Sequence, residues 1–166
     1  MNRSFPPRLF AALVLLLLAS SGHARLGENE AQLVERYTKP IMRSPEMIID
    51  QGKTLPIADN LHFKQGDWHI IARMTGGRCE SITYLKKGEW TEEQFRHVLE
   101  SNGGRSLWEE RKTPTPKTHR EWKRRDSATA TWRMPDGITL STPAFDRARE
   151  AVKKKAKADA STLPKI

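Results

Sequence analysis

The chain is poor in residues that cross-link a fold. Cys79 is the single cysteine among its 166 residues, so an internal disulfide is excluded. Cys79 is expected either to be buried as a small apolar side chain or to be available for an intermolecular disulfide. The 142 residues from Arg25 onward are still enough to bury a core without disulfides or metals.

Long apolar runs are scarce too. The one at residues 9–19 is about half of the roughly 20 residues that a membrane-spanning helix needs. It follows two arginines and precedes small residues that end at Ala24, which is the pattern of an export signal. We expect residues 1–24 to be a signal peptide, cleaved after Ala24, and the mature protein to be periplasmic or secreted. Lipid attachment requires a cysteine directly after the run, and the single cysteine is Cys79, so lipid attachment is not expected.

The sequence also lacks the motifs of common catalytic and metal sites. It has no Gly-x-Ser-x-Gly segment, and its mature histidines do not have the spacing that metal ligation favours. His62 and His69 lie on neighbouring expected strands and could meet across a turn, but no acid or cysteine is placed to complete a zinc site. The sequence does not exclude a pair of carboxylates for glycoside cleavage, because the distance between two carboxylates is set by the fold. We expect no metal, no cofactor and no enzyme.

Positive charge is in excess. The chain has 29 lysines and arginines against 20 acids, a formal net charge of +9. Removal of the predicted signal takes away two arginines, which leaves 27 basic and 20 acidic side chains. Such a charge attracts acidic proteins, phosphorylated lipids or acidic glycans, whereas export disfavours nucleic acid. The basic residues concentrate at 117–125 and 147–157, either as binding surfaces or as a solvated strand face and helix.

Periodicity predicts three helices. They are expected at about residues 28–37, from 91 to the Asn-Gly-Gly at 102–104, and at 143–158. The start of the second predicted helix has the best local evidence. Thr91 is a good N-cap with Gln94 as its capping-box partner, and Trp90 and Phe95 stand at the positions of a hydrophobic staple.

Alternation and turn residues predict two groups of strands. The first comprises a short strand at 47–49 and a three-stranded meander over 61–85, and the second comprises 106–109, 120–125, 128–132 and 138–142. The fold class is therefore α+β, with helices packed on an antiparallel meander sheet. We expect a single domain over 25–158, with halves 25–88 and 89–158 that could be a tandem helix-plus-meander repeat, and a frayed tail at 159–166.

Several sequence blocks resemble small exported bacterial proteins of unassigned function. They are Leu26 to Glu28, Phe63 to Gly66 with Trp68, Cys79 to Tyr84, Asn102 to Gly104 with Trp108, and Trp122 with Arg124 to Ala128. The helix-then-meander order is also similar to outer-membrane assembly lipoproteins of the SmpA/OmlA type, and the tandem order to the β-lactamase-inhibitor protein fold. These resemblances imply a shared fold, export, and a sheet face that contacts a protein partner.

Trp122 is the best candidate for a binding residue. It stands in a basic segment, where it either lies exposed as an anchor beside Arg124 and Arg125 or packs inward while its neighbours point outward. We therefore predict an exported, soluble, non-enzymatic module that binds an envelope protein through these three residues. The first alternative is electrostatic attachment to an anionic envelope polymer or lipid through Lys153, Lys154, Lys155 and Lys157. The second alternative is an uncharacterised hydrolase.

Overall fold

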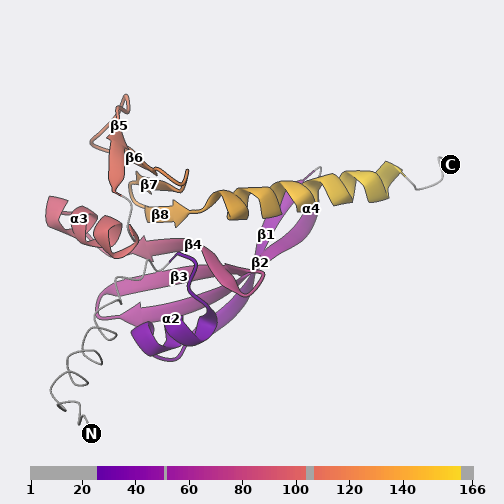
Figure 1. Ribbon diagram of the computed structural model, residues 1–166, viewed down its shortest axis with the longest axis horizontal. Coiled ribbons are helices and arrows are strands. Elements are labelled where there is room, and N and C mark those ends of the chain that lie inside the picture. The colour runs from indigo at the N-terminus through magenta and orange to yellow at the C-terminus, as the bar shows by residue number, and fades with distance from the viewer. Residues whose placement is uncertain (1–25, 51, 104–106, 162–166) are drawn as a thin grey trace, which may run out of the picture.

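The computed structural model describes residues 26–50, 52–103 and 107–161 (Figure 1). In chain order their elements are α2 (Glu30–Tyr37), β1 (Met42–Asp50), β2 (Lys53–Gln65), β3 (Trp68–Thr75), β4 (Arg78–Leu85), α3 (Glu92–Ser101), β5 (Trp108–Arg111), β6 (His119–Arg124), β7 (Thr129–Arg133), β8 (Gly137–Ser141) and α4 (Pro143–Ser161). The fold class is α+β, as predicted. The predicted signal peptide lies outside the described residues.

The strands form one eight-stranded antiparallel sheet, and its order shows how the two halves of the chain join. The order is β1-β2-β3-β4-β8-β7-β6-β5. Each half is a helix followed by a four-stranded meander. The two meanders meet through their last strands, with Ser81 opposite Ser141 and Tyr84 opposite Ile138. Strands β1 and β5 are therefore the two edges of the sheet.

The seam between β4 and β8 requires a glycine at one end. Gly137 has a φ angle of +86°, and a Cβ atom on it would lie 2.2 Å from the backbone oxygen of Tyr84. A side chain would collide with that oxygen, and the left-handed backbone also favours glycine. The predicted turn before β8 is thus also a contact point between the two halves.

Helix α3 begins as its sequence predicts. The Gln94 backbone N–H donates to Thr91 Oγ1 at 3.3 Å, and the Thr91 N–H donates to Gln94 Oε1 at 3.1 Å. The Trp90 ring stacks on Phe95, with centroids 5.2 Å apart. These contacts confirm the capping box and the staple.

Helix α2 begins two residues later than predicted. Asn29 and Gln32 form a capping box at its start. Glu28 lies before the helix, is 3% exposed, and accepts a hydrogen bond from Arg36 Nη2 at 2.5 Å. This hydrogen bond raises the pKa of Arg36, so the buried carboxylate keeps a charged partner.

One face of the sheet, which we call the covered face, is apolar and lies under α2 and α3. Opposed residues of antiparallel strands share a face, so the buried side chains line up across the sheet. They are Leu61, Phe63, Ile70, Ala72, Ile82, Tyr84, Ile138, Leu140, Ala130, Trp132 and Trp122, covered by Leu33 and Tyr37 of α2 and by Phe95, Val98 and Leu99 of α3. We call the other side the open face.

Strands β1 and β2 are longer than the short strands predicted at 47–49 and from Leu61. Pro45 and Pro56 lie inside them and interrupt the strand pattern in the sequence. Pro45 is on an edge strand, where a missing N–H donor is tolerated, and Pro56 lies beside an irregularity in the pairing of β1 with β2. The hairpin therefore extends further than local propensity indicates.

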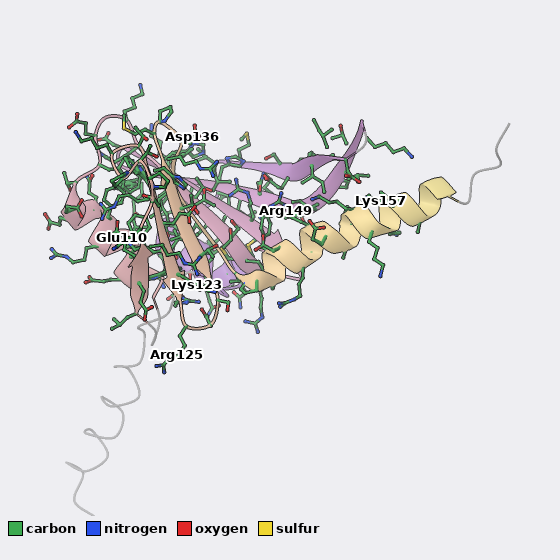
Figure 2. All side chains as sticks on the ribbon, turned by 90° about the horizontal axis from the view of Figure 1, so that it is seen from above. Glu110, Lys123, Arg125, Asp136, Arg149 and Lys157 are labelled. Carbon is green, nitrogen blue, oxygen red and sulfur yellow. The ribbon has the colours of Figure 1, made fainter. Side chains whose placement is uncertain are left out.

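Helix α4 begins at Pro143, as predicted, and lies against the open face at one end. Phe145 is 7% exposed, and with Arg149 it lines a hollow that also includes Ser81 of β4. The helix runs three residues past the predicted end at 158. Figures 1 and 2 show it extending from the sheet alongside β1 and β2.

Candidate functional site

The structure buries the tryptophan that the sequence offered as an exposed anchor. Trp122 is 4% exposed, and its ring centroid lies 5.7 Å from that of Phe95 in α3. The expectation of an exposed Trp122 is therefore wrong. The inward alternative holds, because Trp122 points to the covered face while Glu121 and Lys123 beside it stay partly exposed.

Arg124 is also buried, and its guanidinium joins the end of α3 to the turn between β6 and β7. Its Nε and Nη2 donate to the Asp126 carboxylate at 2.8 and 2.6 Å, and its Nη1 donates to the backbone oxygen of Asn102. The guanidinium carbon lies 5.2 Å from the ring centroid of Trp108. Hydrogen bonding to Arg124 lowers the pKa of Asp126. Arg124 is thus occupied internally.

Arg125 is the exposed member of the three predicted contact residues. It lies in the turn after β6, and Figure 2 shows its side chain pointing away from the sheet. The structure therefore does not bring Trp122, Arg124 and Arg125 together on one accessible surface.

A groove of about 530 Å³ lies between α3 and strands β5 and β6. Its lining includes the aromatic rings of Phe95, Trp108 and Trp122. The guanidinium carbon of Arg120 lies 4.8 Å from the Phe95 centroid and 5.0 Å from the Trp122 centroid. Leu107, also in the lining, is 87% exposed. We call this the arginine groove.

The charge of Arg120 is already balanced in this groove. Its Nε and Nη2 each donate to Glu110 at 2.8 Å, and its Nη1 donates to Glu92 at 2.6 Å. Hydrogen bonding to Arg120 lowers the pKa of Glu110, which keeps that carboxylate ionised. An arginine between two carboxylates has little attraction left for an incoming anion.

The open face carries polar side chains that bind one another across the sheet. The hydroxyl oxygens of Thr83 and Thr139 lie 2.8 Å apart, and Arg73 Nη1 donates to Thr83 at 2.7 Å. Arg73 Nε lies 3.2 Å from a Glu46 oxygen, which also accepts from Asn60 Nδ2 at 2.9 Å. These five residues, which we call the polar network, link β8, β4, β3, β1 and β2.

Two histidines extend this network, as the sequence suggested they could. Ser44 Oγ lies 3.0 Å from His62 Nε2, and His62 Nδ1 lies 3.1 Å from His69 Nε2. Burial, together with the charges of His69 and Arg73, lowers the pKa of His62. His62 is therefore neutral at pH 7. Over the described ranges, no cluster of three or more metal-ligating side chains occurs.

The predicted electrostatic residues lie on the far half of α4. Lys154, Lys155 and Lys157 are exposed, whereas Lys153 pairs with Glu150 at 2.8 Å. Figure 2 shows Lys157 on the part of the helix that projects from the sheet. Among the helices that the structure describes, none is long and apolar enough to cross a membrane.

Cys79 is fully buried in the core, which confirms the first of its two predicted states. Burial is the main reason that the pKa of its thiol is raised. A buried thiol of raised pKa is neither a nucleophile nor accessible to a second chain.

Sequence reasoning missed a second hollow, of about 730 Å³, at the end of the sheet. It lies between the loop that joins β4 to α3, the loop before β6, and the turn after β7. Its lining includes Lys86, Lys87, Lys117, Trp90, Trp132 and Met134. We call it the lysine hollow. The paired lysines at 86 and 87 were the available sequence signal, but only the packing of the two halves brings Lys117 to them.

Comparison with known proteins identifies no family. No protein-family model matches the chain, and no curated protein matches it. A cysteine-rich secretory protein from Staphylococcus aureus subsp. aureus Mu50 is similar in structure, with a TM-score of 0.45 and 15% sequence identity. The match covers 72% of this chain and 45% of that one, so this chain spans less than half of its length. A likeness this low carries no argument, and the resemblances drawn from the sequence stay predictions.

Proposed function

We propose that the chain is an exported, non-enzymatic module that binds an envelope protein on the open face of its sheet. The observation that supports this most is the polar network. Its side chains hold one another in place before any partner arrives, so less conformational entropy is lost on binding. Thr83 and Asn60 are buried within the network. Its partly exposed members, Glu46, Arg73 and Thr139, are therefore the ones that offer a partner hydrogen bonds in fixed directions, which favours one partner over others.

This contact replaces the one expected from the sequence. Trp122 and Arg124 are turned towards α3, so a partner on the open face does not reach them, and Arg125 stays available in its turn. Alternation along the strands assigns to the open face Lys64, Arg73, Arg111, Lys123 and Arg133 against Glu46, Glu109 and Glu121. Basic side chains outnumber acidic ones, so the proposed partner presents an acidic, polar surface.

The open face is broad because two meanders share it, and we propose that the two halves are a diverged tandem repeat. The support is their equal order of elements, a helix and then four antiparallel strands. In such a repeat each half supplies one covering helix and half of the binding face.

A second candidate function rests on α4. The exposed Lys154, Lys155 and Lys157 lie on a helix that projects beyond the sheet, where they can reach an anionic envelope polymer or lipid surface. The two functions differ in salt dependence. Charge contacts between exposed groups lose most of their range near 1 M salt, where the Debye length is about 3 Å.

Affinity capture separates the two functions. The tagged protein is incubated with an envelope extract and washed in parallel at low and high salt, and each retained protein is then purified and its affinity measured. We expect one acidic protein to persist through both washes. Capture that disappears with salt, or that brings down only anionic lipid or polymer, favours the α4 function instead.

Two matched variants then locate the contact. Thr131→Glu places a larger, negatively charged side chain on the open face beside Thr139, its neighbour across the strands, where it repels an acidic partner. Thr115→Glu makes the same change in an exposed loop. Docking on the open face requires that the first variant loses the partner and the second keeps it. Equal affinities of the two variants would contradict the proposal.

A further inference from the structure

The lysine hollow has the size and the walls of a small-molecule site. Its volume of about 730 Å³ falls within the range of roughly 300–1,000 Å³ that such sites occupy. Trp90, Trp132 and Met134 form its apolar side, and Met134 is 56% exposed although its side chain is apolar. Two indole rings beside an exposed thioether are a surface on which a flat or aliphatic ligand body can lie.

The charge of this hollow is unbalanced, unlike that of the arginine groove. Lys86, Lys87 and Lys117 line it together with a single acid, Glu89. The Lys86 ammonium donates to the backbone oxygen of Glu89. Among the described carboxylates, none forms an ion pair with any of these three lysines. The hollow therefore presents positive charge to whatever enters it.

One lining residue also carries an unpaired buried donor. The indole N–H of Trp132 is shielded from water and has no hydrogen-bond partner in the part of the chain that the structure describes. Buried donors are nearly always paired, so an unpaired one marks a position where an acceptor is missing.

We propose that the lysine hollow binds a small organic anion, whose acidic group pairs with Lys87 and Lys117 and whose apolar body lies on Trp90 and Trp132. Carboxylate, sulfonate and phosphate groups all satisfy this chemistry, because each carries negative charge and several acceptor oxygens. The site is separate from the open face, so it binds its ligand whether or not a protein is docked there.

The test compares two probes that share an aromatic body and differ in charge. The anion is 8-anilinonaphthalene-1-sulfonate, and its neutral counterpart is N-phenyl-1-naphthylamine. We expect the sulfonate to bind with a 1:1 stoichiometry by calorimetry and to shift the indole N–H resonances of Trp90 and Trp132 in NMR spectra. The neutral probe should bind at least about tenfold more weakly, a difference of about 1.4 kcal/mol.

Variants show whether the lysines carry the affinity. The double change Lys87→Gln with Lys117→Gln removes two charges from the rim and should weaken sulfonate binding at least about tenfold. The matched control, Lys154→Gln with Lys155→Gln on α4, removes the same charge elsewhere and should leave the affinity unchanged. All four lysines are exposed, so circular dichroism should show both variants folded. Equal affinity of the two variants, or shifts confined to Trp108 and Trp122, would overturn the proposal.

A competition experiment distinguishes a dissolved anion from a lipid headgroup as the ligand. Vesicles of phosphatidylglycerol are compared with free glycerol phosphate as competitors of the bound sulfonate. Competition by vesicles that is lost in the Lys87→Gln and Lys117→Gln variant assigns the hollow to a headgroup, and competition by glycerol phosphate alone assigns it to a dissolved anion. The Thr131→Glu variant should bind the sulfonate normally, so a failure of the proposed docking function leaves this result unaffected.

Discussion

The two faces of the sheet use the same strands in opposite ways. On the covered face, alternate residues are aromatic or aliphatic and pack against α2 and α3. On the open face, many of the residues between them are polar, and several of these bind one another. In β4, for example, Ile82 and Tyr84 face the core while Thr83 faces the polar network. One alternating pattern thus separates the side chains that pack in the apolar core from those that form the polar network.

Substitutions on the two faces should differ most in their effect on the free energy of unfolding at β6. Trp122→Ala should lower the free energy of unfolding by about 3–5 kcal/mol, because it empties a large volume beside Phe95. Lys123→Ala, one residue later and on the open face, should change it by less than about 0.5 kcal/mol. Urea denaturation followed by circular dichroism measures both. A Trp122 variant as stable as the Lys123 variant would show that Trp122 is not a core residue.

Substitutions of the adjacent Arg124 and Arg125 should differ by a smaller amount in their effect on stability. Arg124→Ala removes the hydrogen bonds to Asp126 and Asn102 and should cost about 2 kcal/mol, since hydrogen bonds to charged groups contribute about 1.5–3 kcal/mol. Arg125→Ala removes an exposed side chain and should cost almost nothing. Thermal unfolding of the two variants at the same pH makes the comparison. A greater loss in Arg125→Ala would contradict the assignment of Arg124 as the structural residue.

Two threonines test whether the polar network adds stability. Thr83→Val removes the hydroxyl that joins Arg73 to Thr139, and should cost about 1 kcal/mol. Thr131→Val, on the same face and without a side-chain hydrogen bond to any described residue, should be nearly neutral. Both variants replace threonine by valine, which has a similar shape and β propensity. Equal denaturation midpoints of the two variants would therefore show that the network does not stabilise the fold.

The smallest effect concerns pH. Burial is the main cause of the lowered pKa of His62 in the folded protein, whereas the unfolded chain has the ordinary value near 6.5. The unfolded state therefore binds more protons at mildly acidic pH, and stability falls as the pH drops below about 6.5. His62→Gln should flatten this part of the profile of unfolding free energy against pH. An unchanged slope would assign the acid sensitivity to other groups.

Local chemistry made much of the fold predictable. The start of α3 follows from Thr91 and Gln94, and the hairpins follow from glycine turns between alternating segments. The extended hairpin of β1 and β2 was missed because Pro45 and Pro56 suppress the strand signal, although their positions in the sheet tolerate proline. Elements set by neighbours in sequence were thus found, and those set by tertiary context were not.

The candidate sites were less predictable, because they depend on which face a strand presents and on pairing far along the chain. Nothing in the basic segment around Trp122 says which face points to α3. The contact between His62 and His69 needed only a hairpin, and the sequence suggested it. Lys87 and Lys117 come from different halves of the chain and line one hollow, and no local pattern in the sequence indicates that they do.

The pairing of β4 with β8 also constrains the order of folding. During folding, the β4 edge of the first meander has unpaired backbone groups until residues 138–141 pair with it. Open strand edges of this kind are templates for pairing with other chains, and strand pairing over such a sequence separation is slow. The centre of the finished sheet is therefore an open strand edge while the protein folds, and the pairing of the last strand removes that risk of aggregation.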